Sequence, residues 1–117
     1  SGRKIKFMLV AHVGAETLGL VINSEVNQYK RSRQELLECQ VSIDQANHAG
    51  LEHDSYIDCS YAHYEDTESL CQQLIADIGG IRDEVSDEVR ARVIQALQNS
   101  FVLEKIEKQR LIGCLSY

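Results

Sequence analysis

The pattern of apolar and polar positions divides this 117-residue chain into a strand-rich first half and a helical second half. Residues 5–13 and 17–23 are apolar and rich in β-branched side chains, which is typical of buried strands. The short segment 14–16 between them predicts a tight turn, so the two strands form a hairpin. Gly19, inside the second strand, predicts a β-bulge or a close approach of another backbone.

Alternation of apolar and polar side chains continues beyond this hairpin. Residues 36–43 and 55–61 alternate as half-buried strands do, and residues 62–67 indicate an additional edge strand. The polar and basic stretch 24–35 predicts an exposed loop or a short helix, and residues 44–54 predict a turn-rich connection. The first half therefore predicts three or more strands.

The second half has the spacing of helices. Residues 68–78 have apolar positions at helical intervals, but the clearest helix covers residues 86–100. Ser86 is a good N-cap, and acidic residues follow it where the helix dipole favours negative charge. We expect one stripe of this helix to face the core, namely Val89, Val93, Ala96, Leu97 and Phe101. A further turn or helix is expected over residues 103–112.

Strands followed by helices predict one α+β domain, mainly β, over residues 1–117: an antiparallel sheet or small barrel with helices on one side. A composition of 44% hydrophobic and 26% charged residues excludes a disordered chain. No apolar run approaches the roughly 20 residues that span a bilayer, and no signal peptide is recognisable, so we expect a cytoplasmic protein without membrane contact.

The four cysteines lack the clustered spacing of a zinc site, and no metal is expected. Cys39 and Cys59 lie within apolar alternation and are interpreted as buried, reduced thiols. A net charge of −6 argues against broad coating by nucleic acid. The cations nevertheless gather in two places, Arg3, Lys4 and Lys6 at the start and Lys30, Arg31 and Arg33 further on, and such basic loops can hold a short RNA.

Three passages, in this order and spacing, resemble the MazF/PemK-type toxin ribonucleases of type II toxin–antitoxin systems. They are FMLVAHVGAETLGLVINSE (7–25), GLEHDSYIDCSYAHYED (50–66) and IGGIRDEVSDEVRARVIQALQNSF (78–101). The likeness spans residues 3–101, although each passage alone is degenerate. It implies a small SH3-like antiparallel β-barrel with a C-terminal amphipathic helix.

The resemblance also implies a reaction and its residues. The family cleaves RNA without a metal or cofactor, using a basic residue before one strand and a hydroxyl residue at the end of the next. Carried over by position, Ser24 matches the hydroxyl residue, and Lys6 or Arg3 matches the basic one. His53, beside Asp54, is a further candidate for acid–base work. The RNA-binding residues would be Tyr29, Lys30, Arg31 and Arg33, with Tyr29 stacking on a base.

The chain departs from the family at its beginning. The family's Gly-Asp strand and its Arg-Pro pair do not occur, and Arg3-Lys4-Ile5-Lys6 stands in place of the pair, as in a form shortened at the N-terminus. Two functions stay open: an endoribonuclease restrained by an antitoxin protein, and a non-catalytic barrel that binds nucleic acid or a partner protein. The resemblance implies a homodimer in addition. For each of these residues a purely structural role is the alternative. Ser24 can cap a turn, and surface cations often contact only solvent.

Overall fold

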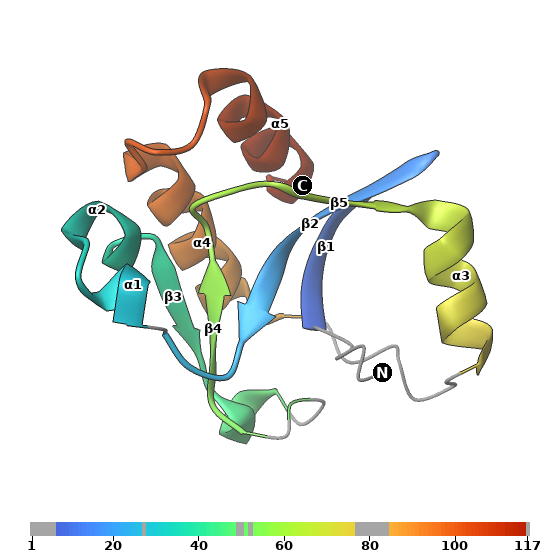
Figure 1. Cartoon of the computed structure of the whole chain (residues 1–117), viewed down its shortest axis with the longest axis horizontal. Helices are drawn as coiled ribbons and strands as arrows, with labels where there is room; N and C mark the ends of the chain where they lie inside the picture. The colour runs from blue at the N-terminus through green and yellow to red at the C-terminus, as the bar shows by residue number, and fades with distance from the viewer. Residues whose placement is uncertain (1–6, 27, 49–50, 52, 77–84, 117) are drawn as a thin grey trace.

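The computed structural model describes residues 7–26, 28–48, 51, 53–76 and 85–116, which form an antiparallel sheet with helices packed on it (Figure 1). The strands are β1 (Phe7–Val13), β2 (Glu16–Asn23), β3 (Gln40–Ile43), β4 (Ser55–Asp58) and β5 (His63–Asp66). The helices are α1 (Gln28–Arg31), α2 (Gln34–Leu37), the 3-10 turn η1 (Gln45–Asn47), α3 (Thr67–Ala76), α4 (Asp87–Asn99) and α5 (Lys105–Leu115). The expected α+β class is confirmed.

Strand β2 lies at the centre of the sheet. One edge of β2 pairs with β1, and the other pairs with β5 near Glu16 and with β4 near Asn23. The order is therefore β1-β2-β4-β3, with β5 following β4 along the same edge of β2. Within the described part of the chain, β1 and β3 end this order, and no pairing between them closes the sheet.

The opening hairpin forms as predicted, and Gly19 explains its irregularity. Opposite Gly19 the register of β1 shifts between Val10 and His12. A Cβ atom on Gly19 would lie 2.5 Å from the carbonyl oxygen of Leu9 and 2.7 Å from Cγ of Met8. Only a residue without a side chain allows the two backbones to approach this closely, which confirms the expected bulge and close contact.

Three sequence-based predictions need correction. The strand predicted for residues 55–61 ends at Asp58 in β4. The strand predicted for residues 36–43 is limited to β3, because the amide of Leu37 donates to the carbonyl of Arg33 and continues helix α2 instead. Phe101, predicted to face the core, is 91% exposed. Helix α4 ends at Asn99, and Ser100 has extended angles (φ −69°, ψ 131°), so the chain turns Phe101 outward.

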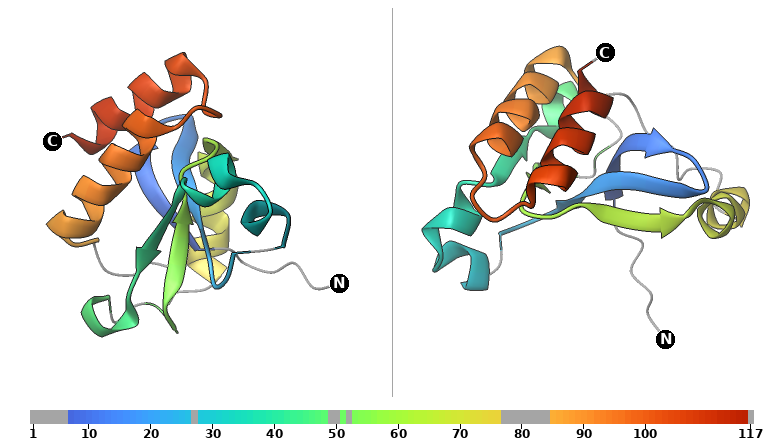
Figure 2. Two further views of the ribbon diagram at one scale, coloured as in Figure 1. Left: turned by 90° about the vertical axis from the view of Figure 1, so that its left-hand side faces the viewer. Right: turned by 90° about the horizontal axis from the view of Figure 1, so that it is seen from above.

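The core lies between one face of the sheet and helices α4 and α5 (Figure 2). Ser86 caps α4 as predicted, since its Oγ accepts a hydrogen bond from the amide of Val89. The predicted stripe then packs on the sheet, with Val89, Val93 and Leu97 all buried. The other most deeply buried apolar side chains are Leu18, Leu20, Ile57 and Leu111. Helix α4 covers β3, and α5 contacts β1.

Two glycines give a matched test of this packing. We expect Gly19→Ala to lower the free energy of unfolding by about 1–3 kcal/mol, because the added methyl group meets the backbone of β1. Gly113 lies in α5, where an added Cβ meets nothing within 4 Å. Gly113→Ala should therefore raise the free energy of unfolding by about 0.5–1 kcal/mol. Urea unfolding of both variants measures the two changes, and equal shifts would contradict this account of Gly19.

Candidate functional site

One end of the sheet brings together segments that are far apart in the sequence. Phe7, the first residue of β1, pairs with Ile22, and Asn23 at the end of β2 pairs with Tyr56 on β4. On the other side of β4, Ser55 pairs with Ile43 at the end of β3. The start of β1, the end of β2, the start of β4 and the end of β3 thus meet at this end (Figure 1).

Two of the predicted site residues lie at this end of the sheet. Ser24 follows Asn23 directly and is exposed, and His53 lies just before β4 and is exposed as well. Their neighbour Asp54 is fixed, because its Oδ1 accepts a hydrogen bond of 2.9 Å from the amide of Gln45. Arg3 and Lys6 lie outside the described residues. The antiparallel register therefore accounts for the proximity of the Ser24 and His53 segments.

The predicted RNA-binding residues form the surface of α1 and the turn after it. Arg33 lies 5.4 Å from the ring centre of Tyr29 and donates to its hydroxyl group at 3.2 Å, and Arg33 also bonds Glu35. Arg31 donates from Nε to the carbonyl of Val26 at 2.9 Å. Both arginines are exposed, and a guanidinium carries five N–H donors, so each keeps donors for a further acceptor.

Lys30 differs from its two neighbours, because its side chain is 17% exposed and bonds the buried carboxylate of Asp58. Asp58 is fully buried and also accepts from Ser60 (amide 2.9 Å, Oγ 2.5 Å) and from the Gln40 side chain at 3.1 Å. Burial raises the pKa of Asp58, but the hydrogen bonds from Lys30, Ser60 and Gln40 outweigh burial and lower the pKa below its usual value. Asp58 is therefore ionised at neutral pH and holds α1 against β4.

His48 forms a second buried polar link, which sequence reasoning did not single out from the other histidines. Its Nε2 accepts a hydrogen bond of 3.1 Å from the amide of Ser86, so this nitrogen carries no proton. Its Nδ1 lies 3.0 Å from the carbonyl oxygen of Asp44 and donates to it. The imidazole thus joins η1 to the start of α4 through both of its ring nitrogens.

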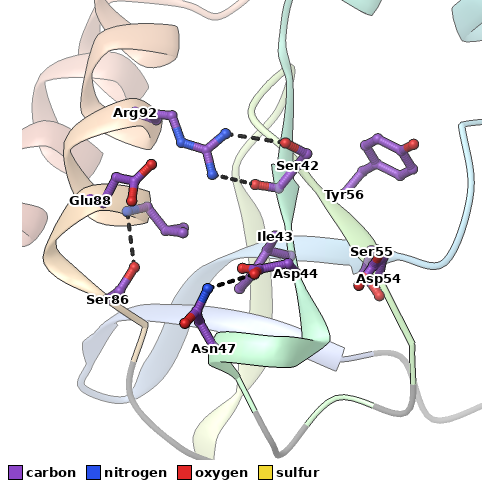
Figure 3. Close-up of a pocket in the computed structure, with 11 residues that line it drawn as sticks. Ser42, Ile43, Asp44, Asn47, Asp54, Ser55, Tyr56, Ser86, Glu88 and Arg92 are labelled. Atoms are coloured by element: carbon purple, nitrogen blue, oxygen red, sulfur yellow. Dashed lines mark hydrogen bonds between the residues drawn. The ribbon is translucent and has the colours of Figure 1, made fainter.

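A cavity of about 680 Å³ opens beside this link, between β3, η1 and the first turns of α4 (Figure 3). Its lining residues are Ser42, Ile43, Asp44, Asn47, Asp54, Ser55, Tyr56, Ser86, Glu88, Val89 and Arg92. Arg92 crosses the opening and donates to the Oγ (3.1 Å) and the carbonyl oxygen (2.7 Å) of Ser42. Three carboxylates against one guanidinium make the cavity a poor place for a phosphate group.

Two of the four cysteines are buried and reduced, as the sequence predicts. Cys39 and Cys59 are buried free thiols, and burial raises the pKa of each, so both stay protonated. Cys71 is exposed and Cys114 is partly buried. In the described part of the chain, no three His, Cys, Asp or Glu side chains are grouped so as to share a metal ion.

No family model, curated protein or solved structure matches this chain in comparisons with known proteins. Among the helices of the described segments, none combines the length and apolar character needed to cross a lipid bilayer.

The buried pair can be tested by removing one charge. Asp58→Asn leaves the Lys30 ammonium opposite a neutral amide, and we expect the free energy of unfolding to fall by about 3 kcal/mol. Glu35→Gln breaks the exposed pair with Arg33 and should change the free energy of unfolding far less, because solvent screens an exposed pair. Urea unfolding at neutral pH compares the two variants, and a similar loss in both would contradict a special role of Asp58.

The same pair predicts a pH dependence. The pKa of Asp58 is lower in the folded than in the unfolded chain, so the stabilisation is complete above the unfolded value of about 3.9. The stabilisation is lost as the pH falls through the lower folded value. We expect the stability difference between the wild type and Asp58→Asn to be constant from pH 7 to pH 5 and to shrink below about pH 4. A difference that instead grew towards acid pH would show the opposite sign of the shift.

Proposed function

We propose that this chain is a metal-independent endoribonuclease of the MazF/PemK toxin type, built on an SH3-like barrel. In the reaction, the 2′-hydroxyl group of the RNA itself attacks the neighbouring phosphate. One observation carries the proposal: the register of β1, β2 and β4 brings the start of the first strand, Ser24 and His53 to one end of the sheet. Of the segments that the resemblance assigns to catalysis, Ser24 lies at this end, and so does Phe7, the residue that follows Lys6 in the sequence.

The chemistry requires few groups. The 2′-oxygen attacks the phosphorus and loses its proton to a base, while the bond from phosphorus to the 5′-oxygen breaks and that oxygen receives a proton. The products are a 2′,3′-cyclic phosphate and a 5′-hydroxyl end. Negative charge gathers on the phosphate oxygens in the transition state, where Lys6 or Arg3 supplies a cation and Ser24 a hydrogen-bond donor. His53 is the candidate in this region for proton transfer, because an imidazole is the side chain that most often serves as a general acid or base.

The surface of α1 suits the binding of the RNA strand. Arg31 and Arg33 are exposed and keep donors for phosphate oxygens, and Tyr29, 61% exposed, offers a ring for a base. Lys30 belongs to this surface in sequence, but its ammonium is bonded to Asp58. In this proposal Lys30 fixes the position of Tyr29 and Arg31, while its charge is neutralised by Asp58.

A second candidate function is a non-catalytic module that binds nucleic acid or a partner protein. It is favoured by the exposed apolar side chains Phe101, Val102 and Ile106 at the turn between α4 and α5. Exposed apolar side chains that lie close together are typical of protein contacts. The antitoxin and the second copy of the chain that the resemblance implies are partners of this kind, in the cytoplasm.

Cleavage of RNA separates the two candidates. Mixed RNA incubated with the full chain in EDTA should yield fragments that end in a cyclic phosphate. Ser24→Ala and Lys6→Ala are each expected to lower the rate about 100-fold, because each removes a group that stabilises the transition state. The matched controls Ser116→Ala and Lys105→Ala change exposed residues of the same types on α5 and its C-cap and should leave the rate unchanged. Unchanged RNA in the presence of the wild type would favour the binding module.

A further inference from the structure

The free edge of β3 borders a continuous groove. The cavity described above shares Ser42, Tyr56 and Arg92 with a second cavity of about 620 Å³. The second cavity continues along β3 to Leu37 and Glu38 and is closed on the other side by Gln95, Ala96 and Asn99 of α4. We call the two cavities together the β3 groove. Arg92 lies at its middle and bridges α4 to β3 (Figure 3).

The backbone of β3 directs hydrogen-bonding groups into this groove that pair with no strand of the described residues. Among the described residues, β3 pairs with β4 alone. The amide of Cys59 donates to the carbonyl of Cys39 at 2.9 Å, and residue pairs of an antiparallel ladder alternate between bonded and non-bonded. Gln40 and Ser42 therefore direct their backbone groups away from β4. The bond from Arg92 to the carbonyl oxygen of Ser42 agrees with this orientation.

The charges along the groove select the chemistry of a ligand. Among the described residues that line it, the carboxylates are Glu38, Asp44, Asp54 and Glu88, and the one cation is Arg92. A second copy of this chain that paired through β3 would bring both sets of carboxylates to one interface, which like charges oppose. An extended segment with lysine and arginine side chains would complement them.

We propose that the β3 groove binds an extended, lysine- and arginine-rich segment of a partner protein, which adds as a strand to the edge of β3. Its backbone pairs with Gln40 and Ser42, and its cations meet the carboxylates of the groove. Strand addition of this type gains affinity from main-chain hydrogen bonds and specificity from alternate side chains. Binding requires Arg92 to release the carbonyl oxygen of Ser42. The hydrogen bond from Arg92 therefore competes with the pairing of other strands at this edge.

A short synthetic peptide in which lysine alternates with threonine and valine is the probe, and the same peptide with glutamate in place of lysine is its control. We expect saturable binding of the lysine peptide, weakened by salt, with the largest amide shift changes in NMR spectra at Gln40 and Ser42. Equal binding of the glutamate peptide, shift changes confined to another surface, or no binding at about 1 mM peptide would overturn the proposal.

Two pairs of variants locate the contacts. Glu88→Gln should weaken lysine-peptide binding about two- to fivefold, whereas Glu68→Gln, also in the first turn of a helix but outside the groove, should not. Arg92→Ala should strengthen binding about two- to tenfold, because the carbonyl of Ser42 no longer has to be released. Arg90→Ala removes the same charge from α4 and leaves that bond in place.

Two further outcomes would overturn the proposal. Equal effects of Arg92→Ala and Arg90→Ala would reduce the role of Arg92 to its charge and overturn strand addition. Sedimentation of the free protein tests the other occupant: a dimer that the lysine peptide fails to dissociate and that blocks its binding would assign the groove to a second copy of this chain. Thermal unfolding of each variant establishes that the folded protein is being compared.

Discussion

The register of β2 is the constraint on which the rest of this structure depends. One edge of β2 pairs with β1 and the other with β4 and β5, so β2 alone decides which residues of four strands face each other. A slip by one residue would turn Leu18 and Leu20 from the core to the opposite face. Gly19 permits this register, because its missing side chain makes room for the backbone of β1. The same register brings Ser24 beside the start of β4.

Two buried polar links then fix the segments that the sheet leaves unsupported. Asp58 and Lys30 hold α1 against β4, while His48 holds η1 to the amide of Ser86 at the start of α4. Each link satisfies groups that would be costly to bury without a partner. Such links add little to stability over an apolar contact of equal size, but they define one arrangement of the segments. The surface of α1 and the walls of the β3 groove are defined by them.

Local sequence patterns predicted much of this fold. The opening hairpin, the bulge at Gly19 and the capped helix α4 depend on neighbouring residues, and all three form as expected. The prediction that Phe101 faces the core was wrong, because the helical period does not indicate where a helix ends. The links through Asp58 and His48, and the groove along β3, join residues that are distant in the sequence, and a single sequence does not encode that pairing visibly. An acid in the apolar run Ile57-Asp58-Cys59 was the one signal that could have indicated a buried partner.

The distribution of charge separates the surface of α1 from the β3 groove. The exposed Arg31 of α1 and Arg33 after it favour an anionic ligand, whereas the carboxylates of the β3 groove oppose one. Tyr56 links the groove to the Ser24 end of the sheet. It lines the groove, and it pairs with Asn23, the residue before Ser24. A strand added to β3 would therefore be separated from Ser24, at the end of β2, by the two strands β3 and β4. Its lysines would reverse the local potential there, so that occupation of the groove and binding of a phosphate chain at Ser24 would favour each other, with the same coupling free energy in both directions.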